Sequence, residues 1–318
     1  MRAAVALEEI EAARARVGPW IRRTPLVPSD VLSERLGRRV SLKLEMLQET
    51  GSFKPRGAFN EVLGLDEKAR RRGIVGVSGG NFARGLAFAG AALGVPTTIV
   101  MPRSTPRHSI EATRRHGARV EVVESIAEAF RRADELAEGG QTPLHPFDDP
   151  AMMAGNGTLG VELVEQAPDV GDVVVSIGGG GLMTGVASAV KALRPGARVW
   201  GVETEGADAM RRSLDAGRLV EIEITSIATT LGAPWVSERT LAAARELLED
   251  VIVVPDAAAV HAIEALMDAG KVVPEPAASC TLAAAEALGD RLGDHVVLVL
   301  CGGNVSFADV VAWRRRFA

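Results

Sequence analysis

Short apolar runs rich in β-branched residues alternate with longer segments of helical periodicity along the whole chain. The apolar runs span residues 40–46, 74–78, 97–101, 118–123, 172–177, 198–203, 251–256 and 295–301. The helical segments include residues 81–93, 182–193, 237–248 and 257–269. Several of the runs are apolar at every position, which is typical of parallel strands that helices cover on both faces. Repeated strand–helix units of this kind predict an α/β fold with mainly parallel sheets flanked by helices.

A chain of 318 residues is long enough to form two lobes. The sequence shows no tandem repeat, and its segment richest in turn-forming residues is AEGGQTPLHPFDDP, residues 137–150. This segment is expected to carry the chain from one lobe back to the other. We therefore predict a large domain formed by residues 1–66 and 148–318 and a small domain formed by residues 67–147.

Composition and charge exclude several classes of protein. Hydrophobic residues make up 47% of the chain and charged residues 24%, as in globular proteins. The net charge of -5 argues against nucleic acid or an anionic membrane as the main partner. Residues 1–17 have the pattern of an amphipathic helix rather than a signal peptide, and no segment resembles a membrane span. These features predict a cytoplasmic protein.

The two cysteines, Cys280 and Cys301, are too few for a disulfide framework or a zinc cluster. Cys280 lies in an alanine-rich run and is predicted to be a buried helix residue. Cys301 differs, because it ends a predicted strand and precedes two glycines. Its thiol is therefore a candidate site residue, although packing alone would also explain it.

The stretch GSFKPRGAFN, residues 51–60, contains an unusual lysine, Lys54. Of the 36 lysines and arginines only five are lysine, and this one lies between a phenylalanine and a proline. Arginine evidently serves for solvated positive charge in this protein. Lysine can lose its proton and attack a carbonyl carbon, which arginine cannot do. Lys54 is therefore predicted to be a reactive amine.

Four loops at predicted strand ends have unusual sequences, and ligands gather at the carboxyl ends of parallel strands. They are SGGN (78–81), GGGG (178–181), CGGN (301–304) and the loop around Lys54. Four glycines between a strand and a helix expose consecutive backbone N–H groups, which bind phosphate without a cationic side chain. A tight turn is the plainer explanation, but one or two glycines would suffice for it.

A dinucleotide site is the rival explanation of the GGGG loop. The G-x-G-x-x-G fingerprint ends on a glycine only in the register that begins at Gly180, and there the middle position is Leu182. The lysine of a Walker A motif is also missing after the glycines. The loop therefore favours phosphate over a nicotinamide dinucleotide.

Asn81 either caps a helix or reaches a ligand, since asparagine is a preferred N-cap residue. A special lysine, a phosphate loop, an asparagine and a Gly-Gly-Asn loop together are the parts that hold pyridoxal phosphate. The lysine forms an imine with the aldehyde, the glycines bind the phosphate, and a neutral group meets the pyridine nitrogen.

The sequence resembles the serine and threonine dehydratase / serine racemase family of pyridoxal-phosphate enzymes, which has the tryptophan-synthase-β-like fold (fold type II). The motifs that carry the resemblance run in family order along nearly the whole chain. They are GSFKPRGA (51–58), SGGN (78–81), VMP (100–102), HPFDDP (145–150), GNGT (155–158), GGGG (178–181), GVE (201–203), EPA (275–277) and CGGN (301–304).

The resemblance implies a role for each matching residue. Lys54 is the Schiff-base lysine, Phe53 packs beside the ring, Asn81 bonds the ring oxygen and Cys301 faces the pyridine nitrogen. The residues implied to bind the cofactor are Phe53, Lys54, Asn81, Gly178, Gly179, Gly180, Gly181, Leu182, Glu275 and Cys301. Those implied to surround the substrate carboxylate are Ser78, Gly79 and Asn81, and Ser78 joins Lys54 as a catalytic residue.

A neutral thiol at Cys301 would not keep the pyridine nitrogen protonated, so the ring would be a weak electron sink, which favours prompt β-elimination. Lys54 would remove the α-proton, and the products would be a keto acid and ammonia. The sequence thus predicts an L-threonine or L-serine dehydratase with a small hydroxy-amino-acid substrate, and a homodimer. The alternatives are β-elimination from 3-hydroxyaspartate or a related amino acid, racemisation, and a cofactor-binding protein without turnover.

The sequence also departs from the family pattern. Racemases of the family have a serine where this chain has Gly79, so racemisation is expected to be weak. A divalent cation would use Glu203 and the Ala207 carbonyl, but Ala209 stands where an aspartate is expected, and Asp208 is the nearest substitute. Residues 227–230, Ile-Ala-Thr-Thr, replace the family's I-A-D-G, which leaves the substrate side-chain pocket undefined. The family's biosynthetic members have a regulatory domain after CGGN, so a catabolic enzyme is expected here.

Overall fold

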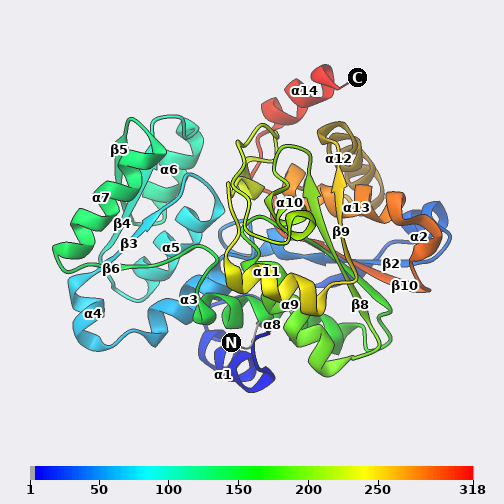
Figure 1. Ribbon diagram of the computed structural model, residues 1–318, viewed down its shortest axis with the longest axis horizontal. Coiled ribbons are helices and arrows are strands. Elements are labelled where there is room, and N and C mark those ends of the chain that lie inside the picture. Colours follow the sequence, from blue (N-terminus) through cyan, green and yellow to red (C-terminus); the bar gives the residue numbers. More distant parts are fainter. Residues whose placement is uncertain (1–3, 318) are drawn as a thin grey trace.

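The computed structural model describes residues 4–317, and within them the strands form one sheet of six and one of four (Figure 1). The larger sheet has the order β1-β2-β10-β7-β8-β9, and the smaller has the order β5-β4-β3-β6. The strands of the larger sheet are β1 (Leu26–Pro28), β2 (Arg39–Leu44), β7 (Asp172–Ser176), β8 (Arg198–Thr204), β9 (Asp250–Val254) and β10 (His295–Leu300). Those of the smaller are β3 (Ile74–Val77), β4 (Thr97–Pro102), β5 (Arg119–Val123) and β6 (Thr142–Pro143). Apart from β1, which is antiparallel to β2, all pairs in both sheets are parallel.

The eight strands predicted from apolar runs are confirmed, each within two residues of its predicted ends. The sequence pattern missed β1 and β6. These strands have three and two residues, and neither is long enough to show a periodicity. β6 lies within the turn-rich segment 137–150 and pairs with β3, after which the chain enters α8.

The helices begin where the sequence supplies capping residues. Side chains of Ser29, Asp66, Ser125, Asp149, Ser237 and Ser306 accept backbone N–H bonds at helix starts. The helices are α1 (Leu7–Val17), α2 (Asp30–Leu36), α3 (Pro55–Gly64), α4 (Glu67–Arg72), α5 (Asn81–Ala92), α6 (Arg107–Arg115), α7 (Ile126–Glu138), α8 (Pro150–Gln166), α9 (Gly181–Leu193), α10 (Ala209–Ala216), α11 (Glu238–Leu247), α12 (Asp256–Gly270), α13 (Pro276–Leu288) and α14 (Phe307–Arg316). Short 3-10 turns are η1 (Glu45–Leu47), η2 (Thr229–Leu231) and η3 (Gly289–Arg291). The four helical segments predicted and the N-terminal amphipathic helix are confirmed, although residues 1–3 of the latter lie outside the described residues.

The main core surrounds the larger sheet. Every residue of β7 and of β10 is buried, as expected for parallel strands with helices on both faces. Helices α12 and α13 lie on one side of this sheet, and α8 and α9 lie on the other (Figure 1). Cys280 is a buried residue of α13, as the sequence predicted.

A second hydrophobic cluster surrounds the smaller sheet. It joins residues of β3, β4 and α5 to Phe59 of α3, which stacks on Trp20 and meets Phe88 edge-on. Helix α3 therefore lies between the two sheets. It contacts α5, which packs on the smaller sheet, and α8, which lies on one side of the larger sheet. No helix within residues 4–317 is long and apolar enough to cross a membrane.

Candidate active site

Lys54 lies where α3 begins, next to the carboxyl end of β10. The backbone N–H of Phe53 donates to the carbonyl oxygen of Cys301 at 3.0 Å, and Ser52 forms an isolated bridge with Gly302. These contacts fix the Lys54 loop against the end of the central strand. The site therefore forms where the strands of a parallel sheet end, as the loop sequences predicted.

The Lys54 amine is enclosed by apolar groups and one carbonyl. Its Nζ donates to the carbonyl oxygen of Pro146 at 2.9 Å, and lies 5.1 Å from the ring centre of Phe53 and 5.6 Å from that of Phe82. Burial lowers the pKa of Lys54 from 10.5 to about 8, because the charged form is poorly solvated here. A larger share of the amine is thus neutral near physiological pH than for an ordinary lysine, and the neutral form is the nucleophilic one.

The glycine loop connects β7 to α9, and Phe147 packs directly against it. A Cβ atom on Gly179 would lie 2.1 Å from the Phe147 ring, and Gly180 has a φ of +96°. Side chains are therefore excluded from this turn, so none of its own residues covers the backbone N–H groups at the start of α9. Leu182 is buried in the first turn of that helix.

Pro146 and Phe147 were missed as site residues, although the motif HPFDDP had been matched. The carbonyl of Pro146 accepts a hydrogen bond from the Lys54 amine, and Phe147 contacts the glycine loop. These two consecutive residues therefore place the amine near the loop. Neither residue carries a functional group that marks it in a sequence. Their place in the site depends on where the chain returns from β6 to α8.

Asn81, at the start of α5, is hydrogen-bonded to residues at the end of the larger sheet. Its Nδ2 donates to Glu275 Oε1 at 2.7 Å, and its Oδ1 accepts from Asn304 Nδ2 at 2.7 Å. Glu275 also accepts from Thr230 Oγ1 at 3.0 Å and from the Asn304 N–H at 3.2 Å. Burial raises the pKa of Glu275 despite these three donors.

This cluster brings together two predicted site residues, Asn81 and Glu275, and two that sequence reasoning missed. Asn304 is the final residue of the CGGN motif, and it was assigned no role from the sequence although the motif itself was noted. Thr230 lies in the 227–230 segment that departs from the family pattern, so nothing in the sequence marked it. The hydrogen bonds of the cluster join α5 of the smaller sheet to the carboxyl end of the larger one.

Cys301 follows β10 and has a neutral thiol. The side chain is 3% exposed, and Ser176 Oγ donates to its Sγ at 3.4 Å. Burial raises the pKa of the Cys301 thiol to about 12. The thiol therefore stays protonated throughout the physiological range.

Ser78, Gly79 and Gly80 form the turn between β3 and α5. Ser78 Oγ accepts the N–H of Gly80 at 3.1 Å. The next turn of α5 packs against the reactive lysine, because a Cβ on Gly85 would lie 2.9 Å from Lys54 Cβ. The helix that follows the SGGN loop thus packs against Lys54.

Glu203 and Ala207, the candidate metal ligands, lie at the end of β8. The carboxylate of Glu203 accepts the backbone N–H groups of Met210 at 2.9 Å and of Arg211 at 2.8 Å, and so caps α10. Ala207 N–H donates to the Thr204 carbonyl at 2.8 Å. Residues 4–317 contain no group of three or more histidine, cysteine, aspartate or glutamate side chains able to hold a metal ion. The metal role stays a prediction.

Behind Lys54, the buried side chain of Arg56 fixes the start of α3. All five of its N–H donors are used: four go to the carboxylates of Glu45 and Glu162 and one goes to Thr158 Oγ1. Lys43 Nζ donates to Glu162 Oε2 at 2.7 Å, so two cations balance two anions. Burial alone would lower the pKa of Arg56, but the carboxylates outweigh it and raise the pKa.

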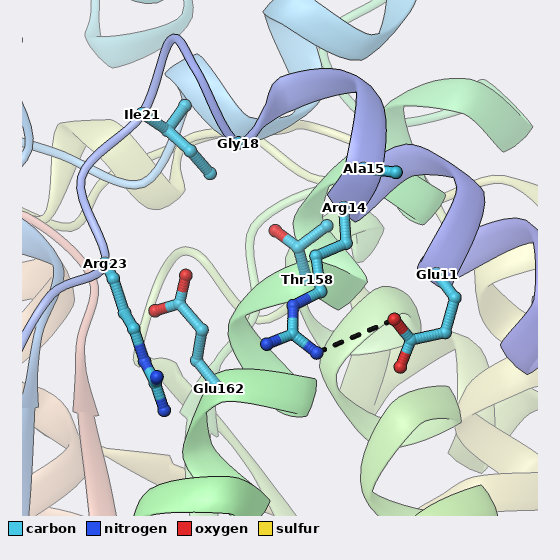
Figure 2. Close-up of a pocket in the computed structure, with 8 residues that line it drawn as sticks. All are labelled: Glu11, Arg14, Ala15, Gly18, Ile21, Arg23, Thr158 and Glu162. Carbon is cyan, nitrogen blue, oxygen red and sulfur yellow. Dashed lines mark ion pairs between the residues drawn. The ribbon is translucent and has the colours of Figure 1, made fainter.

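A surface hollow of about 470 Å³ lies between α1 and α8, on the outer side of this ion cluster (Figure 2). Figure 2 shows the carboxylate of Glu162 between the side chains of Arg23 and Arg14. Arg14 and Arg23 both pair with Glu165. None of the predicted site residues lines this hollow.

The fold and site define a class of protein: an α/β enzyme with a half-buried lysine of lowered pKa and a glycine loop at the ends of parallel strands. A sequence profile described as "Pyridoxal-phosphate dependent enzyme" matches residues 17–302. The chain belongs to this family, and its cofactor is pyridoxal phosphate.

Individual relatives match nearly the whole chain. The L-threonine ammonia-lyase of Thermotoga maritima is 40% identical over 304 residues, which cover 95% of this chain and 76% of that protein. The catabolic L-threonine dehydratase of Staphylococcus aureus is 37% identical over 316 residues, covering 96% and 91%. Among solved structures, maize serine racemase superposes with a TM-score of 0.93 at 32% identity, covering 98% of both chains. The processed form of threonine deaminase isoform 2 from Solanum lycopersicum superposes with a TM-score of 0.91 at 31% identity, covering 98% and 89%.

The residues of the site fit pyridoxal phosphate. Lys54 offers an amine of lowered pKa for the aldehyde, and the glycine loop offers backbone N–H groups in a turn that excludes side chains. Cys301 offers a neutral group at the end of β10. The fold type II architecture and the resemblance inferred from the sequence are therefore confirmed.

Proposed function

We propose that the protein is an ammonia-forming dehydratase that converts L-threonine or L-serine to a 2-oxo acid and ammonia. The observation that carries the proposal is a half-buried lysine, with a pKa lowered to about 8, next to a strand end with a neutral thiol. Relatives named for threonine ammonia-lyase activity are 37% to 40% identical over most of the chain, which supports the same conclusion.

When bound, pyridoxal phosphate supplies an aldehyde that binds amines and a ring that accepts electrons from the α-carbon. Lys54 holds the cofactor and takes the α-proton of the substrate. The N–H groups of the glycine loop would hold its phosphate, Phe53 would pack beside its ring, and Asn81 would reach the ring oxygen. Cys301 would offer the pyridine nitrogen a neutral thiol, which would make the ring a weak electron sink and favour prompt loss of the β-substituent.

The substrate carboxylate binds at the SGGN loop, where Ser78 and the N–H groups at the start of α5 can donate hydrogen bonds. The Cα–H and Cβ–O bonds break, the hydroxyl leaves with a proton as water, and a second water hydrolyses the resulting enamine. Because one water leaves and one enters, L-threonine gives a four-carbon 2-oxo acid and ammonia with no other reactant.

A substrate panel tests this function. Holoenzyme is expected to release a 2-oxo acid and equal ammonia from L-threonine or L-serine, and little from the D-enantiomers. Keto-acid and ammonia assays measure both products. Absence of turnover with both L-substrates would refute the dehydratase.

Two other activities remain candidates for the same site. Faster turnover of 3-hydroxyaspartate in the panel would move the assignment to that substrate class. Racemisation is favoured by the likeness to maize serine racemase but opposed by Gly79, which has no hydroxyl. Formation of the D-enantiomer without elimination would identify a racemase, whereas exchange of the α-hydrogen alone would not, because Lys54 can return a solvent proton to the same face.

The lowered pKa of Lys54 predicts how apoenzyme captures its cofactor. The neutral amine attacks the aldehyde, so the rate of capture is expected to rise with pH through a midpoint near 8, not near the ordinary 10.5. Stopped-flow absorbance after addition of pyridoxal phosphate measures this rate. A midpoint near the ordinary value would show that Lys54 is solvated in the apoenzyme.

We also propose that residues 1–66 and 148–318 act as a large cofactor-binding domain and residues 67–147 as a small one. Support comes from the pairing of β3, β4, β5 and β6 only with one another among the described strands. Helix α3 is shared, since Phe59 packs into the cluster of the smaller sheet. A cytoplasmic homodimer is the further expectation, and light scattering on the purified protein measures its mass.

A further inference from the structure

The side chain of Thr105 fills the space next to Gly79. Gly79 lies between β3 and α5, and Thr105 lies in the loop after β4, the parallel neighbour of β3. A Cβ on Gly79 would lie 2.6 Å from Thr105 Oγ1 and 3.1 Å from its Cγ2. The two loops thus meet at the carboxyl end of the smaller sheet. Position 79 has no hydroxyl of its own, but the Thr105 hydroxyl, from the loop after the neighbouring strand β4, lies against it.

This hydroxyl is buried and unpaired. Thr105 is 8% exposed, and its Oγ1 has no hydrogen-bond partner within residues 4–317. Buried hydroxyl groups in native proteins are nearly always hydrogen-bonded, so an unpaired one needs a reason. The nearby Ser78 Oγ accepts the Gly80 N–H. Thr105 therefore has an enclosed O–H without an acceptor among residues 4–317, at the turn that leads into α5.

We propose that Thr105 is a substrate-contacting residue whose O–H donates to the substrate carboxylate. The inference rests on the proposed function, which places that carboxylate at the SGGN loop. A carboxylate only accepts hydrogen bonds, and therefore matches an unpaired hydroxyl donor. The first turn of α5 adds N–H groups without intrahelical partners and the positive end of a helix dipole. Residues from two adjacent strands of the smaller sheet thus share the recognition of one anion.

Removing the Thr105 hydroxyl should not destabilise the protein, whereas removing a hydroxyl that has an intramolecular partner would. Thr105→Val keeps the shape of the side chain and removes only an unpaired buried hydroxyl. The ligand-free variant is therefore expected to unfold at the same or a higher temperature than the native protein. A lower midpoint would show that the hydroxyl has an intramolecular partner.

The decisive experiment compares two ligands that differ in the carboxylate. L-alanine has no β-leaving group, so its binding to holoenzyme can be titrated through the cofactor absorbance without turnover, and ethylamine lacks the carboxylate. Thr105→Val is expected to weaken L-alanine about tenfold or more, the usual effect of losing a hydrogen bond to a charged group, and to leave ethylamine unchanged. Thr105→Ser keeps the hydroxyl and should stay close to the native affinity.

Thr113→Val is the matched control. Thr113 is buried in α6, and its hydroxyl donates to the Ser109 carbonyl at 2.9 Å, so its loss should not change L-alanine binding.

Equal L-alanine affinity in Thr105→Val and the native protein would overturn the proposal, and so would an equal loss for both ligands. If native holoenzyme shows no response to L-alanine or L-threonine, the proposed function fails instead. Should Thr105→Val not fold, the pair Thr105→Ser and Thr105→Ala makes the same comparison.

Discussion

Lys54→Ala is expected to abolish the absorbance of lysine-bound cofactor and to lower turnover by about 10⁴-fold or more. The physical reason is that one amine has two tasks. It forms the covalent bond to the aldehyde, and it accepts the α-proton once the substrate has displaced it. Among residues 4–317, the groups that the structure places around the amine are Pro146, Phe53 and Phe82, and none of these is a second lysine. Spectra of the purified variant and a keto-acid assay measure both effects.

Two further variants make this result specific. Lys54→Arg keeps a positive charge but cannot form the imine, and should be as inactive as the alanine variant. Lys68→Ala removes an exposed lysine of α4 and should behave like the native protein. Retained absorbance of lysine-bound cofactor in Lys54→Ala would mean that a different amine holds the cofactor.

Arg56→Met is expected to lower the free energy of unfolding by about 3–5 kcal/mol, the usual cost of breaking a buried ion pair from one side. The variant leaves the carboxylates of Glu45 and Glu162 with only Lys43 as a cation, in a cluster where Arg56 and Glu45 are fully buried. Five hydrogen bonds are lost together. Urea unfolding followed by circular dichroism measures the change.

An exposed ion pair in α4, between an arginine and a glutamate, is the matched control for Arg56. Arg71 pairs with Glu67, but their side chains are 69% and 81% exposed, so Arg71→Met should change stability by less than about 1 kcal/mol. Arg56→Lys should lie between the native protein and Arg56→Met, because an ammonium has three donors and cannot pair bidentately with two carboxylates. Equal stability of Arg56→Met and Arg71→Met would show that the cluster is not needed for folding.

Much of the site was predictable because its chemistry is concentrated in short motifs. Lys54 stood out because lysine is rare in this chain, and the GGGG loop stood out because its glycines exceed what a turn needs. Cys301 was found by its position at a strand end. In each case the residue was recognised from its type or from its place next to an apolar run, which are local features of the sequence.

The residues that sequence reasoning missed act through contacts between distant segments. Asn304 bonds Asn81, 223 positions away, and Thr230 bonds Glu275, 45 positions away. Pro146 and Thr105 contribute a carbonyl and a hydroxyl, which many residues of the chain also carry. A common group becomes part of a site only through its neighbours, and the sequence does not state them.

By itself the sequence determined the fold class and the eight longer strands, and it singled out Lys54 and the glycine loop as candidates, since each depends on periodicity or composition within a few residues. Only the tertiary structure decided which groups surround the amine, which hydroxyl lies next to Gly79, and that Arg56 uses every donor it has. The reason is physical. Burial, the pKa shifts it causes and the satisfaction of hydrogen bonds are properties of packed surroundings, and those surroundings exist only after both sheets have come together around α3.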